Sequence, residues 1–210
     1  MKGARPMGSL TSLTDATALL VADASAVINL NATGCAAEIL KALPNPVAVT
    51  DVVPGELETG RWRGRRDSDM LQELVTAGLV SIVELNSVAA AHFERLVVGP
   101  AVSTLDDGEA ATIAYAVANG GTPIIDERKA KRICAERFPS LHPACSTDLF
   151  AHENVMREIG KTMLTQALVN ALQIARMRVL PHHRKWVLDL IGPEQAALCT
   201  SLPNSVRQRV

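Results

Sequence analysis

Membrane-length apolar runs, aromatic side chains and closely spaced cysteines are all scarce in this chain of 210 residues. Its richest apolar stretch, residues 18–30, is interrupted by Asp23 and Asn29, whereas a membrane span needs roughly 18 uninterrupted apolar residues. The sequence therefore argues against a membrane-spanning protein. Lys2 and Arg5 are typical of the start of a signal peptide, but the apolar stretch comes too late and carries acidic residues. We therefore expect a cytoplasmic protein.

The four cysteines lie far apart and form none of the paired motifs that zinc sites use, so we expect reduced thiols. Aromatic residues make up only 3% of the chain, so the core must consist of Ala, Val, Leu and Ile. That composition is typical of helices covering a parallel sheet. A charged fraction of 20% and a mean hydropathy of +0.14 exclude extensive disorder.

Charge is unevenly distributed along the sequence. Residues 1–154 carry 13 basic and 19 acidic side chains, a net charge of -6, whereas residues 155–210 carry 8 and 3, a net charge of +5. An acidic body is unlike a simple DNA-binding domain, whose surface must offset phosphate charge. We infer that some of the acidic residues gather at a site.

Short apolar runs alternate with segments of helical period, which predicts an α/β fold with a parallel sheet. The apolar runs are 19–22, 47–50, 80–85, 123–125 and a short run near 141–145. The helical segments between them are 24–43, 54–58, 68–77, 89–98, 109–118 and 130–137. We assign residues 1–16 to a flexible N-terminus, 17–153 to the α/β domain and 154–210 to a helical C-terminal extension.

The extension is expected to begin with one long amphipathic helix over Asn154–Val179. Met156, Ile159, Met163 and Leu168 recur near helical spacing, so we expect them to pack against the domain or a second subunit. Pro181 ends this helix, and Gly192-Pro193 ends a shorter helix that follows it.

Four acidic residues fall where a predicted strand gives way to the next segment: Asp23, Glu56, Glu109 and Asp126. Open α/β sheets bind ligands at the carboxyl ends of their strands, so these side chains can converge. Clustered carboxylates repel one another unless a cation neutralises them. Ligation by oxygen alone suits Mg²⁺ or Mn²⁺, and such an ion can orient water for hydrolysis of a phosphodiester.

Each acid also has a purely structural interpretation. Asp23 and Asp126 could cap the helices that follow, and Asp106 with Glu109 fits a capping box. Glu56 could simply stabilise a helix N-terminus electrostatically. Only the joint placement of the four acids favours a site.

The sequence around these acids resembles the PIN-domain nucleases, which include VapC-type toxins. The matching motifs are Val-Ala-Asp23-Ala-Ser25-Ala-Val-Ile-Asn-Leu, Val-Val-Pro-Gly-Glu56-Leu, Asp-Gly108-Glu109-Ala-Ala-Thr-Ile-Ala-Tyr-Ala and Ile-Ile-Asp126-Glu127-Arg-Lys-Ala. The Gly-Glu and Asp-Glu-Arg-Lys-Ala forms resemble a poorly characterised branch rather than the commonest toxins, which carry Asp at the third position. The resemblance covers about residues 18–150.

The resemblance implies a parallel sheet sandwiched by helices and Mg²⁺- or Mn²⁺-dependent cleavage of an RNA substrate. It also implies a homodimer and a small antitoxin partner, as in toxin–antitoxin systems. The residues that it assigns to both the metal site and catalysis are Asp23, Glu56, Glu109 and Asp126. Ser25 would orient Asp23 or a metal-bound water, or else be an ordinary serine at a helix start. Glu127 would assist from outside the metal site, or else be a solvated residue of a charged loop. The alternative is a degenerate PIN-like module that binds a protein or RNA without cutting it.

A basic stretch follows Glu56 and comprises Arg61, Trp62, Arg63, Arg65 and Arg66. Arginines can grip phosphates while a tryptophan stacks on an unpaired base, which would make this stretch an RNA contact. A solvated loop and a contact for an acidic antitoxin segment are the alternatives.

Overall fold

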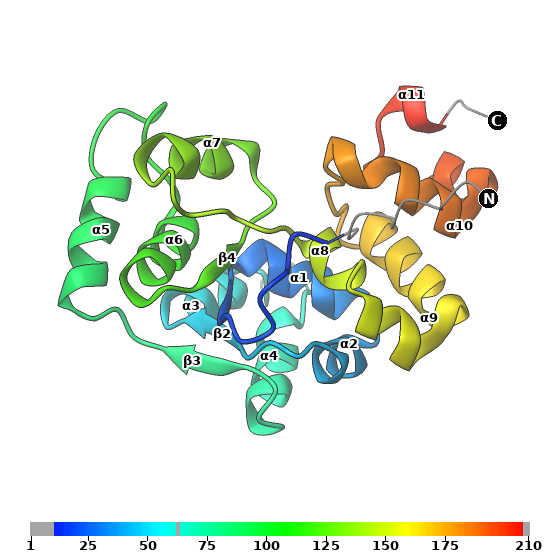
Figure 1. The fold of residues 1–210 in the computed structure, drawn as a ribbon, viewed down its shortest axis with the longest axis horizontal. Helices are drawn as coiled ribbons and strands as arrows, with labels where there is room; N and C mark the ends of the chain where they lie inside the picture. The colour runs from blue at the N-terminus through cyan, green and yellow to red at the C-terminus, as the bar shows by residue number, and fades with distance from the viewer. Residues whose placement is uncertain (1–10, 62–63, 208–210) are drawn as a thin grey trace, which may run out of the picture.

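The computed structural model describes residues 11–61 and 64–207, and it confirms the predicted parallel α/β fold (Figure 1). Four parallel strands form one sheet in the order β3-β2-β1-β4. Their bounds are β1 Leu20–Ala22, β2 Val47–Thr50, β3 Ser81–Val83 and β4 Thr122–Ile124. The apolar run near residues 141–145 adds a parallel bridge between Ala144 and Ile124. All four strands are three or four residues long.

Helices connect the strands and continue after the sheet. Their bounds are α1 Ala24–Ala32, α2 Ala36–Ala42, α3 Val52–Thr59, α4 Asp67–Thr76, α5 Ser87–Val97, α6 Asp107–Asn119, α7 Arg128–Arg137, α8 Ser146–Phe150, α9 Glu153–Gln173, the 3-10 turn η2 Pro181–His183, α10 Arg184–Leu198 and α11 Asn204–Arg207. The helix expected over residues 24–43 is two helices, because Gly34 adopts a φ of +76° between them. No helix in the described part of the chain is long and apolar enough to span a membrane.

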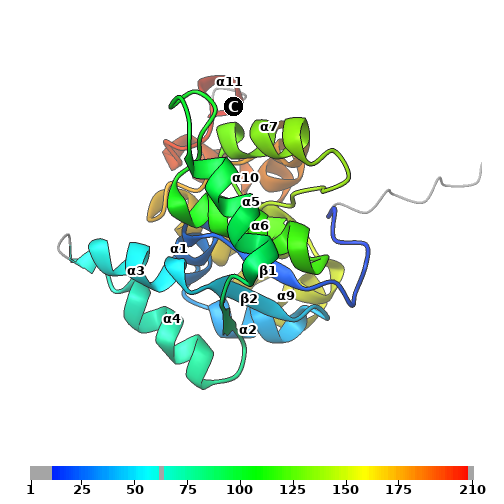
Figure 2. The ribbon, with the colours of Figure 1, turned by 90° about the vertical axis from the view of Figure 1, so that its left-hand side faces the viewer.

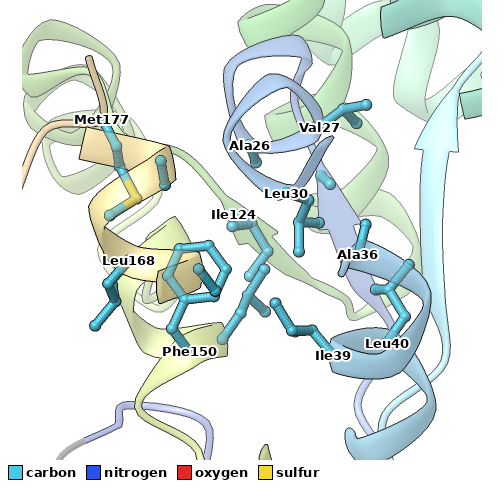
Figure 3. Close-up of a cluster of buried hydrophobic side chains, with 14 of the residues drawn as sticks. Ala26, Val27, Leu30, Ala36, Ile39, Leu40, Ile124, Phe150, Leu168 and Met177 are labelled. Carbon is cyan, nitrogen blue, oxygen red and sulfur yellow. The ribbon is translucent and has the colours of Figure 1, made fainter. Parts of the chain in front are cut away.

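Helices surround the sheet (Figures 1 and 2), and the buried apolar side chains form a larger and a smaller core. Leu20 and Ala22 of β1 belong to the larger core, which they share with α1, α2, α8 and α9. In Figure 3, Phe150 of α8 lies between Leu168 of α9 and Ile39 of α2. The smaller core lies among α5, α6 and α7. Side chains of the C-terminal extension therefore complete the core that covers one face of the sheet.

The extension does not contain the single long helix expected from the sequence. Helix α9 ends at Gln173 and is interrupted at Gly160, whose φ of 73° and ψ of 163° are not helical. The residues before and after Gly160 therefore do not share one continuous apolar stripe. Leu168 is fully buried and Ile159 packs against the core as expected, but Met163 is 46% exposed.

Part of the segment expected to be flexible is held in place. Residues 1–10 lie outside the described residues, but Leu13 is buried and the Thr11 hydroxyl donates to the Asp148 carbonyl oxygen at 2.8 Å. The Ser12 N–H donates to Asp148 Oδ1 at 2.8 Å. The assignment of residues 11–13 to a loose terminus was therefore wrong, because a buried carboxylate far along the sequence binds this backbone.

Candidate active site

Asp23 lies directly after β1 and is only 2% exposed. Its Oδ1 accepts the Ala26 N–H at 2.7 Å, so Asp23 caps α1, and the Ser25 hydroxyl donates to the same oxygen at 2.9 Å. Burial raises the pKa of Asp23 to about 8. The negative charge of Asp126 and, less strongly, that of Glu109 add to this rise, so both carboxylates lie within electrostatic range of Asp23. Asp23 is therefore both a helix cap and a member of a repelling cluster.

Asp126 follows β4 and is 5% exposed. Its Oδ1 accepts the Ser146 N–H at 2.9 Å, and its Oδ2 accepts the Asn29 amide at 2.7 Å and the Ser146 hydroxyl. Burial raises the pKa of Asp126 even though these donors and the charge of Lys131 oppose the rise. Asp126 does not cap α7, whose first turn receives no side-chain bond. Three donors, from Asn29 and Ser146, instead fix its orientation and leave Oδ1 able to accept a further bond.

Glu109 lies in the first turn of α6 and is partly exposed. Burial raises its pKa to about 7, and the charges of Asp106 and Glu127 contribute. The backbone N–H of Asp106 and the charge of Lys129 oppose this rise. Asp23, Glu109 and Asp126 form what we call the three-acid cluster, and Glu109 is its most solvent-accessible member.

Glu56 lies at the edge of this cluster. Its charge is not among those that raise the pKa of Asp23, which are the charges of Asp126 and Glu109. Its Oε1 accepts the Gly108 N–H at 2.7 Å, so it satisfies the N-terminus of α6, whereas the Asp106 side chain makes no cap hydrogen bond. A Cβ atom at Gly108 would lie 2.2 Å from Glu56 Oε2, so only glycine permits this approach. Glu56 is thus attached to the residue before Glu109, at the edge of the three-acid cluster.

The residues flanking the cluster are also placed by the structure. Glu127 is exposed, and its Oε2 lies 3.1 Å from Nη1 of Arg178 in the C-terminal extension. Arg61, Arg65 and Arg66 pair with nearby carboxylates, so part of their charge is already neutralised. Trp62 and Arg63 lie outside the described residues.

A protein-family model described as a PIN domain matches residues 19–139, more than half of the chain and all four acids. This chain belongs to the PIN-domain family. PIN domains are generally nucleases and usually use a divalent metal. Searches of curated proteins and of solved structures returned no match.

The acids of this PIN domain have the donor chemistry of a site for a divalent cation. Burial is the main cause that raises the pKa of Asp23 to about 8, and the charges of Asp126 and Glu109 add to the rise. A cation beside these carboxylates would offset both effects. The donors are carboxylate oxygens, which Mg²⁺ and Mn²⁺ prefer.

A second group of metal-ligand type lies outside this site. Atoms of Cys145, Asp148 and His183 lie within 4.8 Å of one another, and all three residues are buried. The Cys145 thiol lies 3.0 Å from Asp148 Oδ2, and His183 Nε2 lies 3.2 Å from Oδ1. Burial raises the pKa of the Cys145 thiol, and the charge of Asp148 adds to the rise. The three groups are joined by hydrogen bonds that Asp148 accepts from Cys145 and shares with His183.

The sequence reasoning missed Asn29, Ser146 and Gly108. Asn29 carried a signal, since an amide in the apolar run Ala26-Val-Ile-Asn29-Leu has to find a polar partner when it is buried. Ser146 and Gly108 carried none, because their partners are 20 and 52 residues away.

Proposed function

We propose that this PIN domain is a metal-dependent endoribonuclease that hydrolyses phosphodiester bonds of RNA. The observation that carries the proposal is the cluster of Asp23, Glu109 and Asp126, in which burial, with the charges of Asp126 and Glu109 adding to it, raises the pKa of Asp23 to about 8. A structural role does not require three acids to be placed where they repel one another. This placement favours a nuclease over a non-catalytic module, which would gain stability by losing an acid.

The residues have separable roles in the proposed reaction. Asp23 and Asp126, with Glu56 and Glu109 at the more open side, would hold Mg²⁺ or Mn²⁺. When bound, the ion would supply positive charge that activates water and stabilises the developing negative charge on the phosphate. Ser25 orients Asp23, while Asn29 and Ser146 orient Asp126.

The proposal is tested by incubating the purified chain with end-labelled single-stranded RNA in Mn²⁺, Mg²⁺ or EDTA. We expect Asp23→Asn to abolish cleavage, because the substitution removes the charge and preserves the shape and the cap to Ala26. Asp51→Asn is the matched control, since Asp51 is exposed at the carboxyl end of β2 and makes no cap bond. Calorimetric titration with Mn²⁺ gives a second readout, in which Asp23→Asn should lose binding and Asp51→Asn should keep it. Equal cleavage by both variants would refute the proposal.

The biological role that we propose is the toxin of a toxin–antitoxin pair in the cytoplasm, acting as a homodimer that a small antitoxin protein inhibits. The resemblance to VapC-type toxins supports this role. Induced expression of the chain should then arrest growth, whereas expression of Asp23→Asn should not. Growth arrest by both forms would show that any toxicity is independent of cleavage.

A further inference from the structure

A pocket of about 250 Å³ lies between α1, α3 and the start of α4, next to the proposed catalytic site. We call it the Arg65 pocket. The residues that matter for its chemistry are Ile28, Glu56, Leu57, Thr59, Arg65 and Asp67. None of the roles assigned above to the three-acid cluster uses this cavity.

The Arg65 side chain is held as a donor group in this pocket. Its Nε donates to Asp67 Oδ2 at 2.8 Å, and Asp67 is itself buried and within reach of the Asn31 amide. The two Nη groups of Arg65 have no partner among the residues that the structure describes, although the side chain is 43% exposed. A guanidinium fixed through Nε presents its remaining donors as a planar fork.

The pocket adjoins the proposed site of cleavage through Glu56. This carboxylate lines the pocket while its Oε1 accepts the N–H of Gly108, the residue before Glu109. A nucleotide flanking the phosphate at the three-acid cluster would therefore reach the pocket. This inference rests on the proposed function for the identity of the polymer, but the pocket itself does not depend on catalysis.

The chemistry of the pocket favours a base over a phosphate. The negative charges of Glu56 and Asp67 together exceed the positive charge of Arg65, so the pocket would repel a phosphate. Ile28 and Leu57 give the pocket apolar surface, which suits the flat face of a nucleobase. The paired acceptors O6 and N7 of guanine are the most common bidentate partner of an arginine fork. We propose that the Arg65 pocket binds a nucleobase of the RNA substrate next to the cleaved bond, with a preference for guanine.

The test is equilibrium binding in EDTA, where no cleavage occurs, measured by fluorescence anisotropy with labelled single-stranded RNA octamers. One octamer contains a single central guanine in a uridine background, and the other contains uridine alone. We expect Arg65→Gln to weaken binding of the guanine octamer about tenfold and that of the uridine octamer about twofold, because a charged bidentate contact is lost only with guanine.

Arg66→Gln is the matched control, because Arg66 has the same charge, is adjacent in sequence and does not line the pocket. It should weaken both octamers equally and only slightly. Thr59→Phe is a second variant, placed at an exposed pocket residue where the larger side chain can occlude the cavity without disturbing the core. It should reproduce the loss of guanine preference while leaving Arg65 in place.

Cleavage and binding separate the two proposals. If the unaltered chain cuts RNA but Arg65→Gln and Arg66→Gln bind both octamers alike, the pocket proposal is overturned and the nuclease proposal stands. If the chain never cuts RNA but Arg65→Gln selectively loses the guanine octamer, the nuclease proposal fails and the base pocket stands. Sequencing of the products gives a further check, since cuts by the unaltered chain should fall beside guanine and those by Arg65→Gln should not.

Discussion

Asp126 and Asp148 are both buried carboxylates associated with the short helix α8, yet their pKa values move in opposite directions. Burial raises the pKa of each. At Asp148, hydrogen bonds from His183, Cys145 and the Ser12 N–H outweigh burial and hold the pKa well below its usual range. At Asp126, the donors do not outweigh burial, and the pKa stays raised.

The difference shows how one fold uses buried acids for stability and for chemistry. Asp148 joins three segments that are distant in sequence: the N-terminal segment at Ser12, helix α8 and the turn that contains His183. Its charge is satisfied, so it costs the fold little. In the three-acid cluster at the carboxyl ends of the strands, hydrogen bonds do not outweigh burial, so the charged form of each acid is unfavourable and a cation would stabilise it.

The largest expected effect is on stability, when Asp148, the acid whose charge is satisfied by hydrogen bonds, is replaced. Asp148→Ala should lower the free energy of unfolding by about 3–5 kcal/mol, because it leaves the buried His183 without its partner and also removes the acceptor of the Ser12 N–H. Chemical denaturation measures this change. Asp189→Ala is the control, since it breaks an exposed pair with Lys185 and should cost at most about 1 kcal/mol. Similar losses in the two variants would mean that the Asp148 network does not hold the segments together.

The three-acid cluster and Asp148 should make stability depend on pH in opposite directions. Folded Asp23 keeps its proton up to about pH 8, whereas the ordinary carboxyl loses it near pH 3.8. In EDTA, the folded state therefore binds more protons, and stability should fall as pH rises from about 4 to about 8. Asp148 has a lowered pKa when folded, so its contribution is present above its ordinary pKa and is lost as pH falls below it.

Melting temperatures between pH 3 and 9 in EDTA and in Mn²⁺ test both limbs. Mn²⁺ should remove the decline toward pH 8, Asp23→Asn should reduce it without metal, and Asp148→Asn should flatten the acid limb only. A melting temperature that rises from pH 5 to 8 in EDTA would contradict the raised pKa of the cluster.

The smallest expected effect is on metal affinity, when one of the first two residues of α8, Ser146 or Thr147, is replaced. Ser146→Ala removes the hydroxyl that donates to Asp126 while the Ser146 N–H remains, so we expect Mn²⁺ affinity to fall by about 10- to 100-fold with little change in melting temperature. Thr147→Val is the control on the next residue, where the buried hydroxyl has no partner among the described residues. Its removal should be close to neutral for Mn²⁺ affinity. Equal affinities in the two variants would show that Ser146 does not position Asp126.

Much of the fold was predictable because its signals are local. The alternation of apolar runs and helical periods predicted the parallel α/β architecture, and the positions of Asp23 and Asp126 after short apolar runs placed them at the edge of the sheet. Glycines limited the prediction of the helices. Gly34 and Gly160 adopt positive φ and interrupt segments that have a continuous helical period in the sequence.

The sequence by itself determined which acids are available, the parallel sheet that brings strand ends together and the apolar side chains that bury it. Only the tertiary structure decided which acids repel one another and which are satisfied. Asp148 and Glu56 show why: the donors at Ser12 and Gly108 are 136 and 52 residues away, and backbone N–H groups leave no mark in the sequence. Because the pKa of a buried carboxylate depends on the balance between lost hydration and such donors, its role is set by distant segments.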